Sequence, residues 1–462
     1  MLVALSAHSL LRAQPNQTSQ PAPQLRVSCE WIALPHAEAN RLIRALTSSS
    51  PQSGNAIHES AQQLVAVGKG KLLQQQFFNT TSGLKAKTGT LRHFPYPTEY
   101  DPPEVSTKVV VQGGNVLQGD FKKAEPTNFE TKELGFDLEI EPTVDDSSRY
   151  ADLNLAATWT THAGDKVWGQ GIAEIIQPVF QRCALFAQAL CEHDSWKLVA
   201  LLRPAVPGPG TAAQPMAEER VLVFLKAFID GHGPPLLLDS SSIKEIGVLY
   251  EWVELDAADA DQLMDSIPAS GQTEGLRTAA QALLDSGKAT LFESAYLLVR
   301  GGQKSKLESV LEFPNPTEFD PPTLPQTIIE LPTPVPAPAI TRPIFWPTPT
   351  FSQCFEFKNL GTTAEVEAVA SDDGITLELN SSPEICRLVG IQPHGQGNGF
   401  TTQPRFATIK SGNRVLVKDG QPALIASYEA MPPASLKMVS PEAPPAGNPN
   451  RRILLFVTAW RR

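Results

Sequence analysis

The chain has 462 residues, which is enough for several domains of ordinary size, each with a core of its own. Its formal net charge of -11 disfavours nucleic acid and acidic substrates as partners, because nucleic-acid binding depends on a basic surface. No apolar run approaches the ~20 residues of a membrane-spanning helix, and the 41 prolines are clustered, which indicates connectors between folded units.

The first 20 residues join a short apolar stretch, MLVALSAHSLLRAQ, to a polar stretch that contains several prolines. This pattern is typical of the remains of a secretory signal, and a frayed start is the alternative. A signal would send the chain to the periplasm or the outer membrane. The five cysteines lack the paired spacing of a disulfide framework or a zinc site, so we expect buried, unpaired thiols and no metal.

A ten-residue string occurs twice, as FPYPTEYDPP at residues 94–103 and as FPNPTEFDPP at residues 313–322. Such a repeat predicts a tandem duplication, and its prolines predict an extended, kinked connector. The acids of the first string, Glu99 and Asp101, correspond to Glu318 and Asp320 in the second. Acids beside proline are typical of turns in which a carboxylate caps backbone amides, and a cation or ligand site is the alternative.

Each copy opens with a strand pattern, RVSCEWIAL in copy one and IGVLYEWVEL in copy two, which aligns Trp31 with Trp252. Two amphipathic helices follow in each copy, and the second helix ends at Gly68 or Gly287, which are typical C-terminal caps. Two strands around a turn complete this αβ block. We expect Trp31 and Trp252 to be equivalent residues that pack the helices onto the strand.

The second block of each copy is predicted to be antiparallel β-structure. Residues 134–142 alternate apolar side chains with Asp137, Glu139 and Glu141, which indicates a half-buried strand with an acidic outer face. Residues 183–192 resemble a helix by propensity. The corresponding part of copy two holds Asp419-Gly420 between apolar runs, which is typical of a hairpin, so both stretches are predicted as strands.

The order of these segments resembles the C-terminal homology domain of bacterial secretins, the outer-membrane channels of type II and type III secretion and of type IV pili. The resemblance rests on SG-x-K-A near Ser82, F-P near Phe94, LGFDLEIEPTVDD, ADLNL, QPVF (repeated as QPRF), a D-S or D-G turn and a closing apolar strand. It implies a ring in which subunits contribute β-hairpins to a barrel, with other envelope or secretion proteins or further copies as partners. Pro-rich loops stand where secretins have an apolar lip, so a soluble structural role is an equal expectation.

No nucleophile, metal or phosphate-binding motif occurs, so we expect no enzyme and no cofactor. The main hypothesis is a structural or assembly component of a secretion or pilus system. The alternative is a soluble extracytoplasmic binding or scaffold protein whose Pro-rich tether lets copy two swing. Because the copies have diverged, we expect a water-soluble monomer or small oligomer, and membrane contact is left open.

The predicted fold class is α+β, with two tandem copies, each a small αβ block (strand, helix, helix, hairpin) followed by an antiparallel β-rich block. Copy one is residues 21–230 and copy two is residues 247–462. The predicted layout is a signal remnant at 1–20, αβ block 21–104, β block 105–230, linker 231–246, αβ block 247–322, tether 323–350 and β block 351–462.

Overall fold

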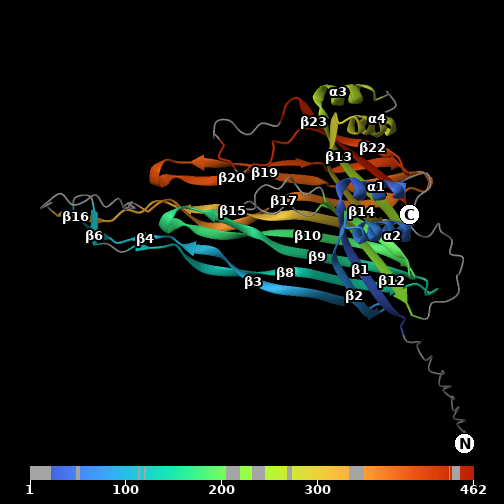
Figure 1. Ribbon diagram of the computed structural model, residues 1–462, viewed down its shortest axis with the longest axis horizontal. Coiled ribbons are helices and arrows are strands. Elements are labelled where there is room, and N and C mark those ends of the chain that lie inside the picture. Colours follow the sequence, from blue (N-terminus) through green and yellow to red (C-terminus); the bar gives the residue numbers. More distant parts are fainter. Residues whose placement is uncertain are drawn as a thin grey trace, which may run out of the picture.

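Two large β-sheets packed against each other and four short helices make up the fold (Figure 1). The computed structural model describes residues 22–47, 53–112, 115–118, 121–203, 219–230, 245–267, 273–331, 348–435, 437–439 and 448–462. Over these residues the predicted α+β class is confirmed, and nearly all strand pairs are antiparallel. The predicted signal remnant lies outside the described residues, as does most of the linker at 231–246.

The first sheet has eight strands in the order β2, β1, β12, β11, β14, β13, β23, β22. The first four strands in this order lie in the segment predicted as copy one, and the last four lie in the segment predicted as copy two. Their bounds are β1 Gln24–Pro35, β2 Lys71–Thr81, β11 Trp196–Leu202, β12 Glu219–Ile229, β13 Glu245–Asp256, β14 Ala289–Arg300, β22 Pro422–Glu429 and β23 Arg451–Arg461.

The second sheet runs along the long axis of the molecule, and the first sheet lies across one end of it (Figure 1). Its strands pair in the order β3, β8, β9, β10, β15 and β17, and β17 pairs in turn with β3 at their outer ends, which closes this part of the sheet on itself. β17 also pairs with β18 and β19, which pair with β21 and β20. The bounds are β3 Ala86–Asp101, β8 Glu125–Val144, β9 Tyr150–Trp168, β10 Ile175–Glu192, β15 Lys304–Asp320, β17 Phe351–Ala370, β18 Thr376–Ser381, β19 Glu384–His394, β20 Thr401–Lys410 and β21 Asn413–Lys418.

The helices cover the face of the first sheet that points away from the second. They are α1 His36–Thr47, α2 Gly54–Ala66, α3 Ala257–Asp265 and α4 Glu274–Asp285. α2 and α4 both end where a glycine adopts positive φ, 74° at Gly68 and 73° at Gly287, which confirms the predicted caps. No helix in the described part of the chain is long and apolar enough to cross a membrane.

Trp31 and Trp252 are 0% and 1% exposed, but they do not pack the helices as predicted. The Trp31 indole makes edge contacts with Phe136 and Trp159 of the second sheet, at centroid distances of 5.5 and 6.3 Å. Trp252 belongs to the same core between the sheets, whereas α3 and α4 pack on a separate cluster around Val253. The prediction is wrong because side chains alternate along a strand, and the neighbours of each tryptophan face the helices instead.

The repeated proline string is extended and kinked, as predicted, but it forms the outer part of β3 and of β15 rather than a connector. β3 pairs with β8 through the string, with shifts of register around Glu99, and β15 pairs with β17 with shifts around Glu318. Bulges of this kind accommodate prolines within a ladder. The small strands beyond the string are β4 Glu104–Val105, β5 Lys108–Gln112, β6 Asn115–Gln118, β7 Phe121–Lys122 and β16 Thr327–Leu331.

The predicted tether at 323–350 is described at both ends, and its residues 332–347 lie outside the described part. Strand β16, inside this segment, pairs in parallel with β5. Thr323 and Thr348 are joined by hydrogen bonds of 2.7 and 2.9 Å, so the segment leaves and re-enters the β15–β17 hairpin at one point. The prediction that it lets copy two swing is therefore wrong.

Residues 183–192 lie in β10, which confirms the strand prediction for this stretch. Four of the five cysteines are buried thiols, and burial raises the pKa of Cys29 and of Cys191 to about 12. Cys354 differs from the prediction because it is half-buried at the outer end of β17.

Candidate functional site

The two copies meet where β11 of copy one pairs with β14 of copy two in the first sheet. Ala200 lies opposite Leu297 and Leu201 opposite Tyr296. β14 and β2 hold equivalent places in their copies, since Trp252 pairs with Glu293 as Trp31 pairs with Gln74. The junction therefore joins an edge strand of copy one, β11, to an edge strand of copy two, β14.

A buried charge cluster lies beside this junction. Both carboxylate oxygens of Glu293 are engaged, one by the Arg203 guanidinium and the other by the Arg220 guanidinium, each at 3.0 Å. The side chains of Glu293 and Arg220 are 3% and 2% exposed. Burial raises the pKa of Glu293, but the two arginines outweigh it and the pKa is lowered overall.

Sequence reasoning missed this cluster because Arg203, Arg220 and Glu293 are far apart in the chain and lie in or beside largely apolar strands. A signal was present in the comparison of the copies, since Glu293 has Gln74 at the equivalent position. A charge that appears in one copy of an apolar strand and is absent from the other indicates a local partner, because burying an unpaired charge is costly.

Helix α1 of copy one extends over the same junction. Asn40 accepts a hydrogen bond from Ser294 of β14 at 3.2 Å, and Arg44 reaches Glu251 of β13 at 3.5 Å. Burial and the neighbouring Arg220 lower the pKa of His36, at the start of α1, to about 4, so this imidazole is neutral at neutral pH. Further ion pairs between the copies are Lys197–Glu245, Arg300–Asp152, Arg182–Glu308 and Lys132–Glu312.

The second sheet repeats the same arrangement with β10 of copy one and β15 of copy two. Phe180 lies opposite Glu312 and Phe186 opposite Lys306. β15 in copy two is equivalent to β3 in copy one, because each forms a long antiparallel pair with the next long strand of its copy. β15 pairs with β17, and β3 pairs with β8. Both sheets are therefore joined in the same head-to-tail sense.

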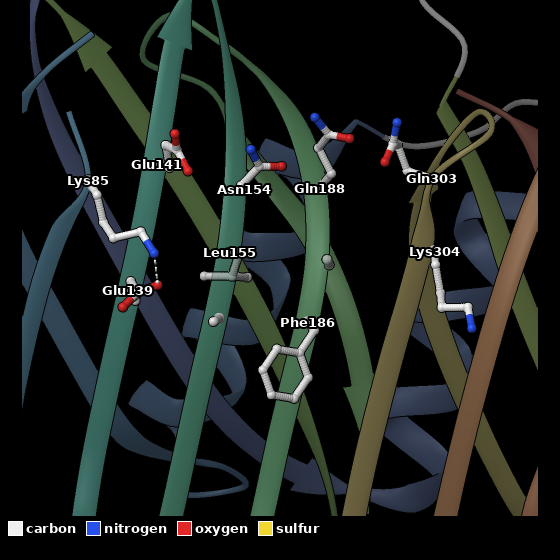
Figure 2. A pocket seen from close by; sticks show the side chains of 11 residues that line it. Lys85, Glu139, Glu141, Asn154, Leu155, Phe186, Gln188, Gln303 and Lys304 are labelled. Carbon is white, nitrogen blue, oxygen red and sulfur yellow. Dashed lines mark hydrogen bonds and ion pairs between the residues drawn. The ribbon is translucent and has the colours of Figure 1, made fainter. Parts of the chain in front are cut away.

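A shallow hollow of about 290 Å³ lies on the charged face of the second sheet, across this junction (Figure 2). Lys85 donates to Glu139 at 2.7 Å, and the Phe186 ring, 38% exposed, projects from β10 between β9 and β15. In copy two Lys304 donates to Glu365 at 2.6 Å, which is the equivalent pair. The predicted acidic face thus carries cross-strand ion pairs, which fit a solvated surface better than a reaction site.

Three of the four predicted site acids, Glu318, Glu99 and Asp320, lie near the thiol of Cys354 at the outer ends of the long hairpins. Glu99 and Asp101 lie in β3, Glu318 and Asp320 lie in β15, and the four occupy strands rather than turns. Glu99 pairs with Cys354 through the backbone, and Glu318 accepts a hydrogen bond from the Cys354 thiol at 3.5 Å. Burial and then the nearby carboxylates raise the pKa of that thiol.

This acidic end gathers three of the predicted acids around one thiol that stays protonated, so it offers no activated nucleophile. Within the described residues, no group of three or more histidine, cysteine or acidic side chains is placed to hold a metal ion.

In the first sheet the outermost strands, β2 and β22, each pair on one side only, and they lie at opposite sides of the molecule (Figure 1). In the second sheet β3 is joined to β17 at Glu99, and Tyr96 of β3 packs against Phe357 of β17 at a centroid distance of 5.6 Å. On β2, Leu72 and Phe77 are 40% and 60% exposed, whereas Tyr296, which is equivalent to Phe77, is fully buried under β11. The edge of copy one is therefore uncovered at positions that are covered in copy two.

No protein-family model matches this chain, and no curated protein matches it. Among solved structures, the chain is similar to the type II secretin GspD from enteropathogenic Escherichia coli, with a TM-score of 0.24 and 13% sequence identity. The match covers 59% of this chain and 79% of that chain. A TM-score of this size does not establish a common fold.

Proposed function

We propose that the chain is a non-enzymatic structural component of the bacterial cell envelope, built from two tandem copies, that assembles through its open sheet edges in a protein secretion or pilus-type system. The observation that carries the assembly role is the pair of open edges, β2 and β22, at opposite ends of the first sheet. The secretion setting is supported by the order of sequence segments that resembles secretins, and export by the pattern of residues 1–20.

The open edges support assembly because a strand edge presents unpaired N–H and C=O groups to any strand that can join it. The edges on β2 and β22 are equivalent to the two that already join at the centre of the first sheet. A contact between unlike edges is heterologous, so it repeats from molecule to molecule and either closes into a ring or continues as a filament. This geometry favours a larger assembly than the monomer or small oligomer expected from sequence.

The alternative is a soluble extracytoplasmic scaffold that works as a monomer. The cross-strand ion pairs on the second sheet favour it, since alternating paired charges, such as Lys85–Glu139 and Lys87–Asp137, keep an exposed sheet face soluble.

The test is the mass of residues 21–462 in solution, measured by light scattering without detergent over a hundredfold range of concentration. We expect multimers whose fraction rises with concentration. A monomer throughout would refute the assembly role and leave the scaffold. An SDS-resistant multimer that forms only in detergent would refute a soluble assembly in favour of a membrane channel.

A further inference from the structure

We infer that the partner of each open edge is the opposite edge of a second copy of this chain, joined in the register that copies one and two already use inside one molecule. This inference rests on the proposed assembly function and adds the partner and the register. It follows from the central junctions, because the chain itself shows how an edge of the β22 kind fits an edge of the β2 kind.

The register in the first sheet follows from equivalent positions in the two copies. β11 pairs with β12 with one shift of register, between Leu198 and Ala200. β22 pairs with β23 with the same shift, between Leu424 and Ala426, so β11 and β22 are equivalent strands. In the same way Leu201 corresponds to Ser427, and Tyr296 corresponds to Phe77. Because Leu201 lies opposite Tyr296, Ser427 of one molecule lies opposite Phe77 of the next.

The second sheet differs from the first in this respect. At the central junction Phe180 of β10 lies opposite Glu312 of β15. The strand equivalent to β15 in copy one is β3, and it already pairs with β17 of the same molecule at Glu99. The inferred contact between molecules is therefore made by the first sheet.

The apolar side chains of β2 agree with this partner. Leu72 and Phe77 are exposed by 40% and 60%, and an added β22 would lie beside Phe77 as β11 lies beside the equivalent Tyr296, which is fully buried. An exposed apolar row on an edge strand is costly in water and invites pairing.

The charges at the open edges differ from those at the centre. At the position of Glu293 in the central junction, the β2 edge has Gln74. At the positions of Arg203 and Arg220, the β22 edge has Glu429 and Arg452. Glu429 and Arg452 face each other at 3.8 Å within one edge. The central junction has a charged triad, Glu293 with Arg203 and Arg220. The outer junction lacks this triad and is neutral, so the two junctions are chemically distinct.

The order of the copies follows from the central junction. Because β11 and β14 already pair within one molecule, β2 and β22 are the edges of the first sheet that remain for a second molecule. Copies one and two therefore alternate along the assembly.

The first test is disulfide cross-linking of Phe77→Cys with Ser427→Cys in one chain that also carries Cys354→Ser, the half-buried thiol being removed. Residues directly opposite in antiparallel strands have Cα atoms about 4.5–5.5 Å apart, within the range of a disulfide. We expect a ladder of dimers, trimers and higher species under mild oxidation. The matched control, Thr80→Cys with Ser427→Cys, places the thiols roughly 10 Å apart by strand rise and should give at least tenfold less product.

The second test transfers the central triad to the outer junction with Gln74→Glu and Glu429→Arg. Each single change leaves an incomplete set of charges, whereas the double variant restores one carboxylate between two arginines. We expect the double variant to associate at least tenfold more tightly than the product of the single effects predicts.

The outcomes separate the inference from the proposed function. Multimers in solution that give no more product with the Phe77→Cys pair than with the Thr80→Cys control, or that show no coupling in the double variant, would overturn this register while leaving the assembly role in place. A monomer at every concentration would overturn both.

Discussion

Replacing Glu293 by glutamine is the sharpest test of the central junction. The amide keeps the size of the carboxylate but removes the charge that Arg203 and Arg220 both engage, and their side chains are only 14% and 2% exposed. Removing one partner of a buried ion pair typically costs about 3–5 kcal/mol, because the remaining charge stays desolvated. We therefore expect Glu293→Gln to lower the free energy of unfolding at pH 7 by roughly that amount.

The assay is equilibrium unfolding in urea, followed by circular dichroism. The control is Glu429→Gln, since the Glu429 side chain is 82% exposed and its pair with Arg452 is long, so a change of about 0–1 kcal/mol is expected. A Glu293→Gln variant that unfolds within 1 kcal/mol of the wild type, roughly the error of the extrapolation, would refute the role given to the cluster.

The same variant has a predicted pH dependence. Because the folded pKa of Glu293 is lowered, its contribution is fully present above the unfolded pKa of about 4.3 and is lost as pH falls through the folded value. The stability difference between wild type and Glu293→Gln should therefore be constant near neutrality and shrink below pH ~4. A difference that grows in acid would contradict this sign.

Three further predictions follow from other parts of the molecule. Trp31→Ala and Trp252→Ala should each destabilise the protein by about 3–5 kcal/mol, since both indoles are buried between the sheets, and unchanged melting of both variants would count against the shared core. Limited proteolysis should cut within 323–350 before other sites, as expected for a Pro-rich segment, and uniform resistance there would oppose the predicted layout. Asp373 accepts hydrogen bonds from the Thr376 hydroxyl and from the Ile375 and Thr376 amides, and together they lower its pKa to about 2. Asp373→Ala should therefore speed hydrogen exchange at both amides at pH 5, whereas in the wild type that turn should loosen only as pH falls towards 2.

The sequence was sufficient for the elements but not for their partners. The two helices per copy, their glycine caps and the strand at 183–192 were predictable, because local periodicity and a second copy of each segment constrain them. The assembly of β1 with β12 was not predictable, since Leu25 pairs with Ile229 about two hundred residues later and no local pattern encodes such a contact. The predicted division into separate αβ and β blocks stays a prediction, although strands of both blocks share each sheet.

The site was less accessible to sequence than the fold. The repeated acids were found, and the structure does bring Glu99 and Glu318 to one place, but their function is not thereby assigned. The charges that join the copies were missed, because Glu293 and Arg220 meet only after two distant apolar strands have been placed in one sheet. The orientation of Trp31 failed for a related reason, since alternation along a strand cannot tell which face the helices will cover.

The pairing of β11 with β14 has a consequence for folding during synthesis on the ribosome. β12 completes the strands that copy one contributes to the first sheet at Ile229, but the strand that covers its β11 edge ends only at Arg300. Translating the intervening ~70 residues at ~5–20 residues per second takes roughly 4–14 s, and during that time β11 is bare. β10 stays bare for longer, because the strand that covers it, β15, ends at Asp320. Chains emerging side by side on one messenger can exchange partners in this interval, which would produce entwined dimers. Slower translation of residues 231–300 should therefore increase misassembly without changing any contact of the finished protein.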